Sequence, residues 1–76
     1  MKPIKIPNEK ELLQEIRNNN CREILSCGIN MRIAEGSKTK YPARMGEIEN
    51  FITVQRQRLD DLTDGVRLID ERINEL

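Results

Sequence analysis

The sequence predicts an all-α or mostly α protein built around one long C-terminal helix. The chain has 76 residues, which allows one small domain at most, because a single core usually needs about 100 residues. Only 3% of the residues are aromatic, so a core must come from aliphatic side chains. The C-terminal stretch 43–76 contains no proline and repeats its apolar residues with helical spacing. We expect one domain, residues 1–76, with a helical and loop part (1–41) and a long pairing helix (42–76).

Two short helices are expected in the first part of the chain. Asn8, followed three residues later by Glu11, is typical of a helix N-cap, so the first helix is expected over about residues 9–17. The asparagine run at 18–20 favours a turn. A second short helix is expected after that turn, and both helices are expected to pack on the long one.

Residues 21–35 fit two structures. Their apolar side chains suit a helix that ends at Gly36, but those within 29–34 also alternate as in a strand. Residues 2–6 alternate as well and could pair with such a strand. A small α+β unit before the long helix is therefore the alternative fold. The polar stretch 37–41 is expected to be a loop.

The long helix is expected to begin at Pro42, because a missing N–H costs nothing in the first turn. A strict alternation of three and four residues then selects ten positions, nine of them apolar. This spacing is typical of a coiled-coil seam with left-handed wrapping. The predicted oligomerisation residues are Met45, Ile48, Ile52, Gln55, Leu59, Leu62, Val66, Ile69, Ile73 and Leu76.

A second copy is expected to cover this seam. A helix over residues 43–76 would be about 51 Å long, while a compact domain of this size is about 30 Å across. Either a second copy pairs with the helix, or the helix breaks near Gly65. The seam continues through Gly65 without a change of phase, which favours a homodimer, in parallel or antiparallel register.

Three large apolar residues of the long helix, Phe51, Val54 and Leu68, lie off the seam. Bare side chains of this size would lower solubility. The N-terminal helices are therefore expected to cover them.

The composition argues against catalysis and metal binding. The chain has no histidine, the commonest general base and metal ligand. Cys21 and Cys27 are too few and too far apart for a zinc site, and both are expected to be reduced thiols. We predict no enzyme activity and no catalytic, cofactor or metal residue. Since no apolar run approaches the ~20 residues of a membrane span, we expect a cytoplasmic protein with no membrane partner.

Charge is divided unevenly although the net charge is zero. Residues 1–44 hold nine cationic and five acidic side chains, and residues 45–76 hold four and eight. A basic region around the expected loop is formed by the partner-binding candidates Arg32, Lys38, Lys40, Tyr41 and Arg44. Cations at such a site favour a partner with an acidic surface.

These features predict a small non-enzymatic protein–protein interaction module: a regulator, adaptor or inhibitor that homodimerises through its C-terminal helix. Proteins of this kind are typical accessory products of bacteria and phages. The alternative is binding of nucleic acid or a phosphate ligand through region 32–44.

Overall fold

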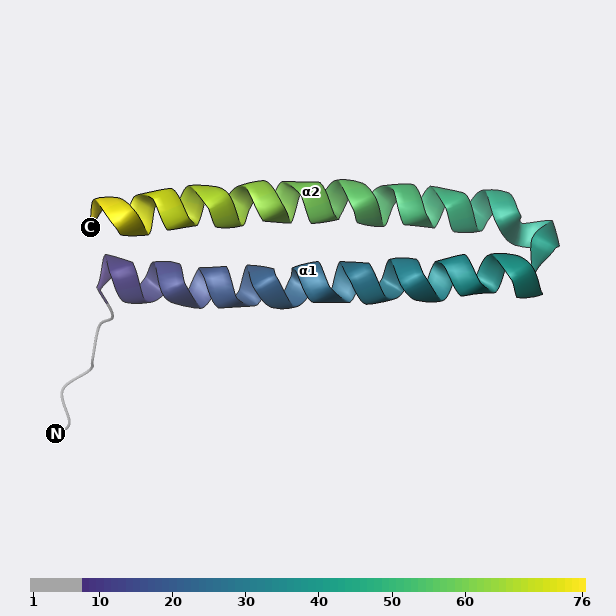
Figure 1. Cartoon of the computed structure of the whole chain (residues 1–76), viewed down its shortest axis with the longest axis horizontal. Helices are drawn as coiled ribbons and strands as arrows, with labels where there is room; N and C mark the ends of the chain where they lie inside the picture. Colours follow the sequence, from purple (N-terminus) through teal and green to yellow (C-terminus); the bar gives the residue numbers. More distant parts are fainter. Residues whose placement is uncertain (1–7) are drawn as a thin grey trace, which may run out of the picture.

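The computed structural model describes residues 8–76, which form a hairpin of two long antiparallel helices (Figure 1). Helix α1 spans Glu9–Lys40, the short 3-10 helix η1 spans Pro42–Arg44, and α2 spans Met45–Glu75. The all-α prediction is confirmed.

The structure corrects the predicted N-terminal half. The strand alternative over residues 29–34 is wrong, because these residues lie inside α1. Its proposed partner strand, residues 2–6, lies outside the described residues. The two short helices are also wrong: α1 is one helix of 32 residues that runs through the asparagine run at 18–20 and through Gly36. Contacts along α2 outweigh the weak helix propensity of asparagine and glycine.

The start of α1 agrees with the sequence pattern. The side-chain Oδ1 of Asn8 accepts a hydrogen bond from the backbone N–H of Glu11 at 2.8 Å. This bond satisfies one of the free N–H groups in the first turn of the helix. The predicted N-cap is therefore confirmed, with α1 beginning at Glu9.

The reversal between the helices is very short. Residues 37–40, predicted to be loop, belong to the last turn of α1. The helix ends at Tyr41 (φ −129°, ψ 65°), whose N–H still donates to the carbonyl of Ser37 at 2.9 Å. Pro42 explains this end, because its ring disfavours the helical conformation in the residue before it. Pro42 then begins η1, so the long helix starts three residues later than predicted, at Met45.

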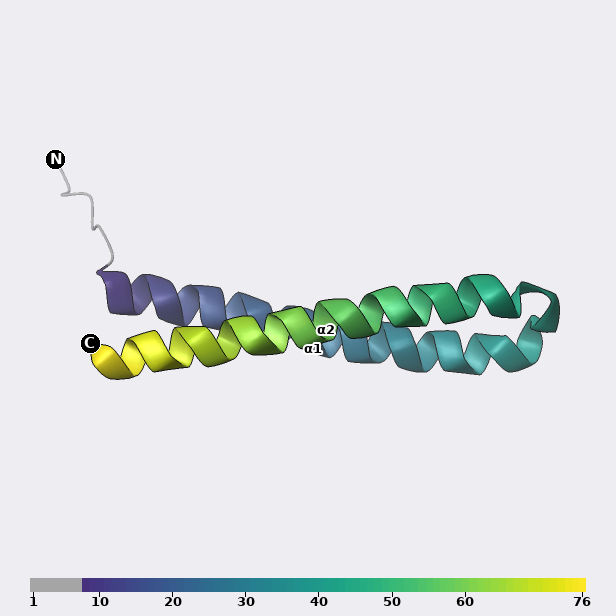
Figure 2. The same cartoon turned by 90° about the horizontal axis from the view of Figure 1, so that it is seen from above.

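The two helices meet along one seam, which we call the hairpin seam. On α2 its members follow the predicted 3,4 spacing, and Ile52 is its most buried residue, at 5% exposure. On α1 the same spacing selects a set of buried and half-buried residues: Leu13, Arg17, Asn20, Ile24, Cys27, Met31, Ala34 and Lys38. A 3.5-residue period on both helices predicts left-handed wrapping, and Figure 2 shows the helices crossing at a small angle.

The α1 half of the seam is difficult to recognise from the sequence. Three of its eight members are polar (Arg17, Asn20 and Lys38), and two are small (Cys27 and Ala34). Of the large apolar residues in this half, Leu13, Ile24 and Met31 belong to the seam, whereas others, such as Ile29, are largely exposed. A search for large apolar residues alone therefore does not separate the seam from the surface of α1.

The α2 seam has a partner within the chain. The seam positions from Ile48 to Ile73 face α1, and α2 continues unbroken through Gly65. The side-chain Nδ2 of Asn20 lies 3.5 Å from the place where a Cβ on Gly65 would be. The structure thus adds a third arrangement to the two predicted ones: α1 itself covers the seam that was assigned to a second copy.

The expected cover over three other residues of α2 is absent. Phe51, Val54 and Leu68 are 44%, 63% and 56% exposed, so the prediction that the N-terminal half packs on them is wrong. The reason is geometric: α1 is a single straight helix that can cover only one stripe of α2, and the seam occupies that stripe.

We expect substitutions at Ile52 to lower the stability of the hairpin. Ile52→Val should cost about 0.5–1.5 kcal/mol and Ile52→Ala about 2–5 kcal/mol, because each leaves a cavity in the seam. The matched change Ile29→Ala, at a site 54% exposed, should stay within about 0.5 kcal/mol. Thermal unfolding followed by circular dichroism measures all three. Equal effects at the two sites would contradict the assigned seam.

We expect Gly36→Ala to stabilise the protein by about 1 kcal/mol, the difference in helix propensity between the two residues. Gly36 lies within α1, has no positive φ, and a Cβ added there would meet no atom within 4 Å. An unfolding midpoint equal to or below that of the wild type would contradict the continuous helix at this position.

Candidate functional site

The predicted basic region lies at the turn end of the hairpin, where carboxylates neutralise part of it. The Lys38 Nζ lies 3.4 Å from Oε2 of Glu35 and 3.8 Å from Oε1 of Glu49. An Arg44 Nη2 lies 3.1 Å from Oε2 of Glu47. Lys38 therefore links α1 to α2 at the hairpin seam, and the contact with Glu47 holds Arg44 beside the start of α2.

The other three candidates are exposed, but the structure does not gather all five. Lys40 and Tyr41 lie beside Arg44 in sequence at the turn, with Tyr41 56% exposed. Arg32 lies eight residues before Lys40, about 12 Å along α1. Residues 32–49 hold four cations and three carboxylates. The region is thus only weakly basic, which disfavours the nucleic-acid alternative.

A further surface emerges on one side of the hairpin, which we call the apolar face. In heptad notation with the seam at a and d, this side carries the g and c positions of both helices. The cross-helix ion pairs Glu9–Arg72 (2.7 Å) and Glu23–Arg58 (3.3 Å) join g positions there. Six of its large side chains are exposed and apolar: Leu12, Ile16, Ile33, Phe51, Val54 and Leu68.

The opposite side of the hairpin is polar. Ion pairs there join the seam cations Arg17 and Lys38 to Asp70 and Glu49 at e positions, at 2.6 and 3.8 Å. Among the e and b positions of both helices, Leu25 is the one large apolar residue within the described chain. The asymmetry between the two sides singles out the apolar face.

A groove of about 390 Å³ lies on the apolar face next to the turn. It runs between the helices, with apolar walls and a polar rim. Its residues are Ile33, Ala34, Ile48 and Phe51, with Asn30, Ser37, Arg44 and Glu47. Arg44, a predicted partner-binding residue, is therefore on the rim of an apolar groove. A groove of this shape can receive aliphatic side chains while its rim pairs with polar groups.

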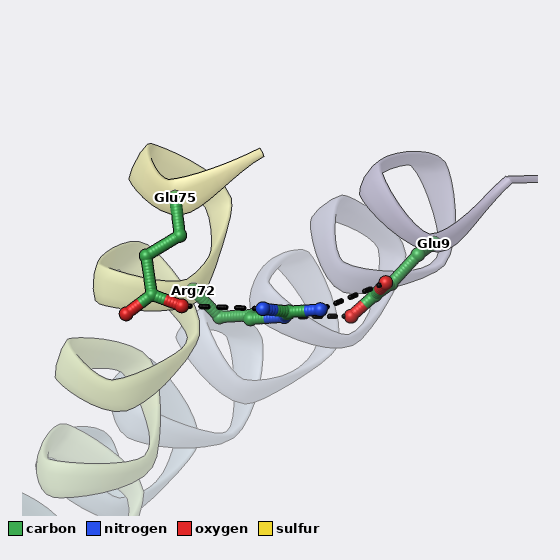
Figure 3. A network of polar contacts seen from close by, with 3 residues as sticks. All are labelled: Glu9, Arg72 and Glu75. Atoms are coloured by element: carbon green, nitrogen blue, oxygen red, sulfur yellow. Dashed lines mark hydrogen bonds and ion pairs between the residues drawn. The ribbon is translucent and has the colours of Figure 1, made fainter.

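The other end of the apolar face carries a charged cluster, shown in Figure 3. The Arg72 Nε and Nη2 donate to the two carboxylate oxygens of Glu9 at 2.7 and 3.2 Å, and its Nη1 donates to Glu75 at 3.2 Å. The hydrogen bond from Arg72 lowers the pKa of Glu9 below its ordinary value of 4.5. The same contacts raise the pKa of Arg72. With two carboxylates and one guanidinium, this cluster of three described residues has a net negative charge.

No candidate metal site is found within residues 8–76. They contain no group of three or more histidine, cysteine, aspartate or glutamate side chains arranged to hold a metal ion. Both cysteines are free, with Cys21 half-buried and Cys27 buried in the seam. Neither α1 nor α2 has a stretch long and apolar enough to cross a membrane.

Comparison with known proteins finds no matching family model, no similar curated protein and no similar solved structure.

Sequence reasoning found half of the apolar face. It identified Phe51, Val54 and Leu68 as apolar residues that need cover, but it did not connect them with Leu12, Ile16 and Ile33. The missing signal was the register between the helices, which puts all six on g or c positions of one side. Without the α1 seam this register could not be assigned.

The contact between Glu9 and Arg72 should make stability depend on pH. Since the folded state favours ionised Glu9, its contribution is complete above the ordinary pKa of 4.5 and is lost as the pH falls through the lowered value. We therefore expect Glu9→Gln to lower the unfolding midpoint near pH 7. The difference from the wild type should shrink as the pH falls through the lowered pKa of Glu9, because the protonated carboxyl is then as uncharged as the glutamine that replaces it.

Glu15→Gln provides the control, because Glu15 is exposed and makes no ion pair in the structure. Its unfolding midpoint should follow the wild type across the series. A Glu9→Gln deficit that stays constant with pH would contradict the assigned contact.

Proposed function

We propose that this chain is a non-enzymatic protein-interaction module, a regulator, adaptor or inhibitor. It binds a helical partner over the apolar face, and its basic turn end meets acidic side chains of that partner. The observation that carries the proposal is the apolar face itself: six large apolar side chains on one side of a hairpin in which three described residues are buried.

The hairpin gains from covering this face. Fully burying one large aliphatic or aromatic side chain is worth about 1.5–3 kcal/mol. The exposed members of the face, such as Val54 at 63%, would gain much of this free energy if a partner covered them. The seam itself buries little apolar surface, because most of its members are only half-buried. A contiguous apolar surface on a chain this small therefore supports a role in binding.

The shape of the face favours a helix as its partner. The face runs along two antiparallel helices whose axes are nearly parallel, and each helix is about 45 Å long. Ile33 and Phe51 stand on opposite helices and line one groove between them. A third helix laid along such a groove can insert a stripe of aliphatic side chains, as in helix-in-groove recognition.

The turn end supports the expectation of acidic side chains on the partner. Lys40 is exposed without an ion pair in the described chain, and Arg44 is 70% exposed in its side chain despite its contact with Glu47. Both lie on g or c positions, at the edge of the apolar face. Charges at the rim of an interface mainly set orientation and rate of association.

An acidic amphipathic peptide of three heptads, with leucine at its seam positions and glutamate at most others, tests this proposal. Native mass spectrometry distinguishes a complex of one 8.9 kDa chain and one peptide from a dimer of two chains without peptide. We expect the wild type to bind the peptide. Lys40→Glu combined with Arg44→Glu should weaken binding about tenfold, because two attractive rim contacts become repulsive.

The matched control combines Arg22→Glu with Arg56→Glu, which changes the charge equally at exposed sites without ion pairs. It should bind within about twofold of the wild type. Equal weakening in both variants, or no complex at peptide excess, would contradict the proposed site. Tighter binding of a single-stranded oligonucleotide, with steep loss on adding salt, would favour the nucleic-acid alternative instead.

A further inference from the structure

We infer that the partner covering the apolar face is a second copy of this chain, laid antiparallel to the first so that two hairpins form a four-helix bundle. This inference rests on the proposed function and names its partner. It also transfers homodimerisation from the α2 seam, which α1 covers, to the apolar face.

Charged, apolar and polar side chains alternate along the face. From the open end, a charged group (Glu9, Arg72, Glu75) is followed by an apolar cluster (Leu12, Ile16, Leu68). A polar band (Asn19, Glu23, Arg58, Asp61) comes next, followed by a second apolar cluster (Ile33, Phe51, Val54). A second charged group (Lys40, Arg44, Glu47) ends the face. Among the charged and the large apolar side chains of the face, the order of types is the same from either end, which suits a symmetric antiparallel pair of copies.

The contacts of the hairpin fix these positions. Leu68 lies between Gly65, which meets Asn20, and Arg72, which binds Glu9, so it lies level with Leu12 and Ile16. At the other end, the shared groove sets Ile33 level with Phe51. The two apolar clusters are therefore built from both helices.

The spacing of the clusters suits a two-fold axis across the middle of the face. From Ile16 to Ile33 is 17 residues on α1, about 26 Å, and from Leu68 to Phe51 is 17 residues on α2. The Glu23–Arg58 ion pair lies between the clusters. An axis at this pair would bring each cluster of one copy onto the other cluster of its partner.

The charges at the two ends favour the antiparallel register. At the open end, the described charged side chains of the face are Glu9, Glu75 and Arg72, which together are net negative. The turn end, with Lys40, Arg44 and Glu47, is net positive. An antiparallel pair joins opposite charges at both ends, whereas a parallel pair joins like charges. The acidic partner surface expected from the sequence is then the open end of the second copy.

The groove and the area of the face also fit a second copy. In this register Leu12 and Ile16 of one copy approach the groove beside Phe51 of the other, and the two-fold axis repeats this contact. A face about 45 Å long and about 20 Å wide buries roughly 900 Å² per copy, or roughly 1,800 Å² in total. This area lies within the range of stable protein interfaces.

Sedimentation equilibrium over about 1 µM to 1 mM tests the pairing. We expect the wild type to have twice the 8.9 kDa mass of one chain. Ile33→Glu combined with Leu68→Glu should weaken association at least about 100-fold, because each copy buries two carboxylates in an apolar contact. Both residues are more than half exposed in the single hairpin, so helicity by circular dichroism should be retained.

The control combines Leu25→Glu with Ile29→Glu, which are 67% and 54% exposed and lie off the apolar face. This variant should associate as the wild type does. A single-chain wild type at every concentration, or equal loss of association in both variants, would overturn the inference.

Charge reversal tests the register. Lys40→Glu with Arg44→Glu, and separately Glu9→Lys with Glu75→Lys, should each weaken association about tenfold. All four changes in one chain should restore association to within about threefold of the wild type, because the ends again carry opposite charges. Association weaker than in either double variant would show like ends in contact and overturn the antiparallel arrangement.

The outcomes separate this inference from the proposed function. If the wild type never associates but binds the acidic peptide on its apolar face, the inference fails and the proposed function stands. If it neither associates nor binds the peptide, both fail.

Discussion

The hairpin depends on one contact surface, the seam between α1 and α2. Within residues 8–76 the short η1 is the one element besides α1 and α2, so the two long helices must make most of their long-range apolar contacts with each other along this stripe. The described residues put Cys27, Ala34 and Ile52 at its most buried positions. The remaining seam residues stay partly accessible. This limited burial explains how a folded chain can still carry large apolar side chains on its outer surface.

The sequence revealed the long C-terminal helix because its seam is made of aliphatic residues at regular spacing. The N-cap at Asn8 was equally visible, since it depends on two residues close in sequence. The length of α1 was not predictable from local signals. Asn20 and Gly36 favour breaks when considered alone, and only the contact with α2 along the whole length keeps them helical. The polar member Arg17 belongs to the seam because Asp70 of α2 receives its guanidinium.

In the candidate site, too, some features were predictable from local sequence and others depended on contacts between the helices. Arg44 was found from charge alone and does lie on the rim of a groove. The groove itself needs Ile33 and Phe51 together, 18 positions apart in sequence. Their proximity follows from the reversal at Pro42 and from the register of the seam. Charge composition therefore pointed to the turn end of the molecule, while the apolar surface could be identified only from the fold.

The tight reversal at Pro42 brings the start of α1 and the end of α2 to the same end of the hairpin (Figure 1). Any segment fused to either end of residues 8–76 would therefore leave from one pole of a rod about 45 Å long. In an antiparallel pair these poles lie at opposite ends. Such an assembly would act as a rigid spacer that holds two attached molecules apart at a fixed distance, a property that neither helix has alone.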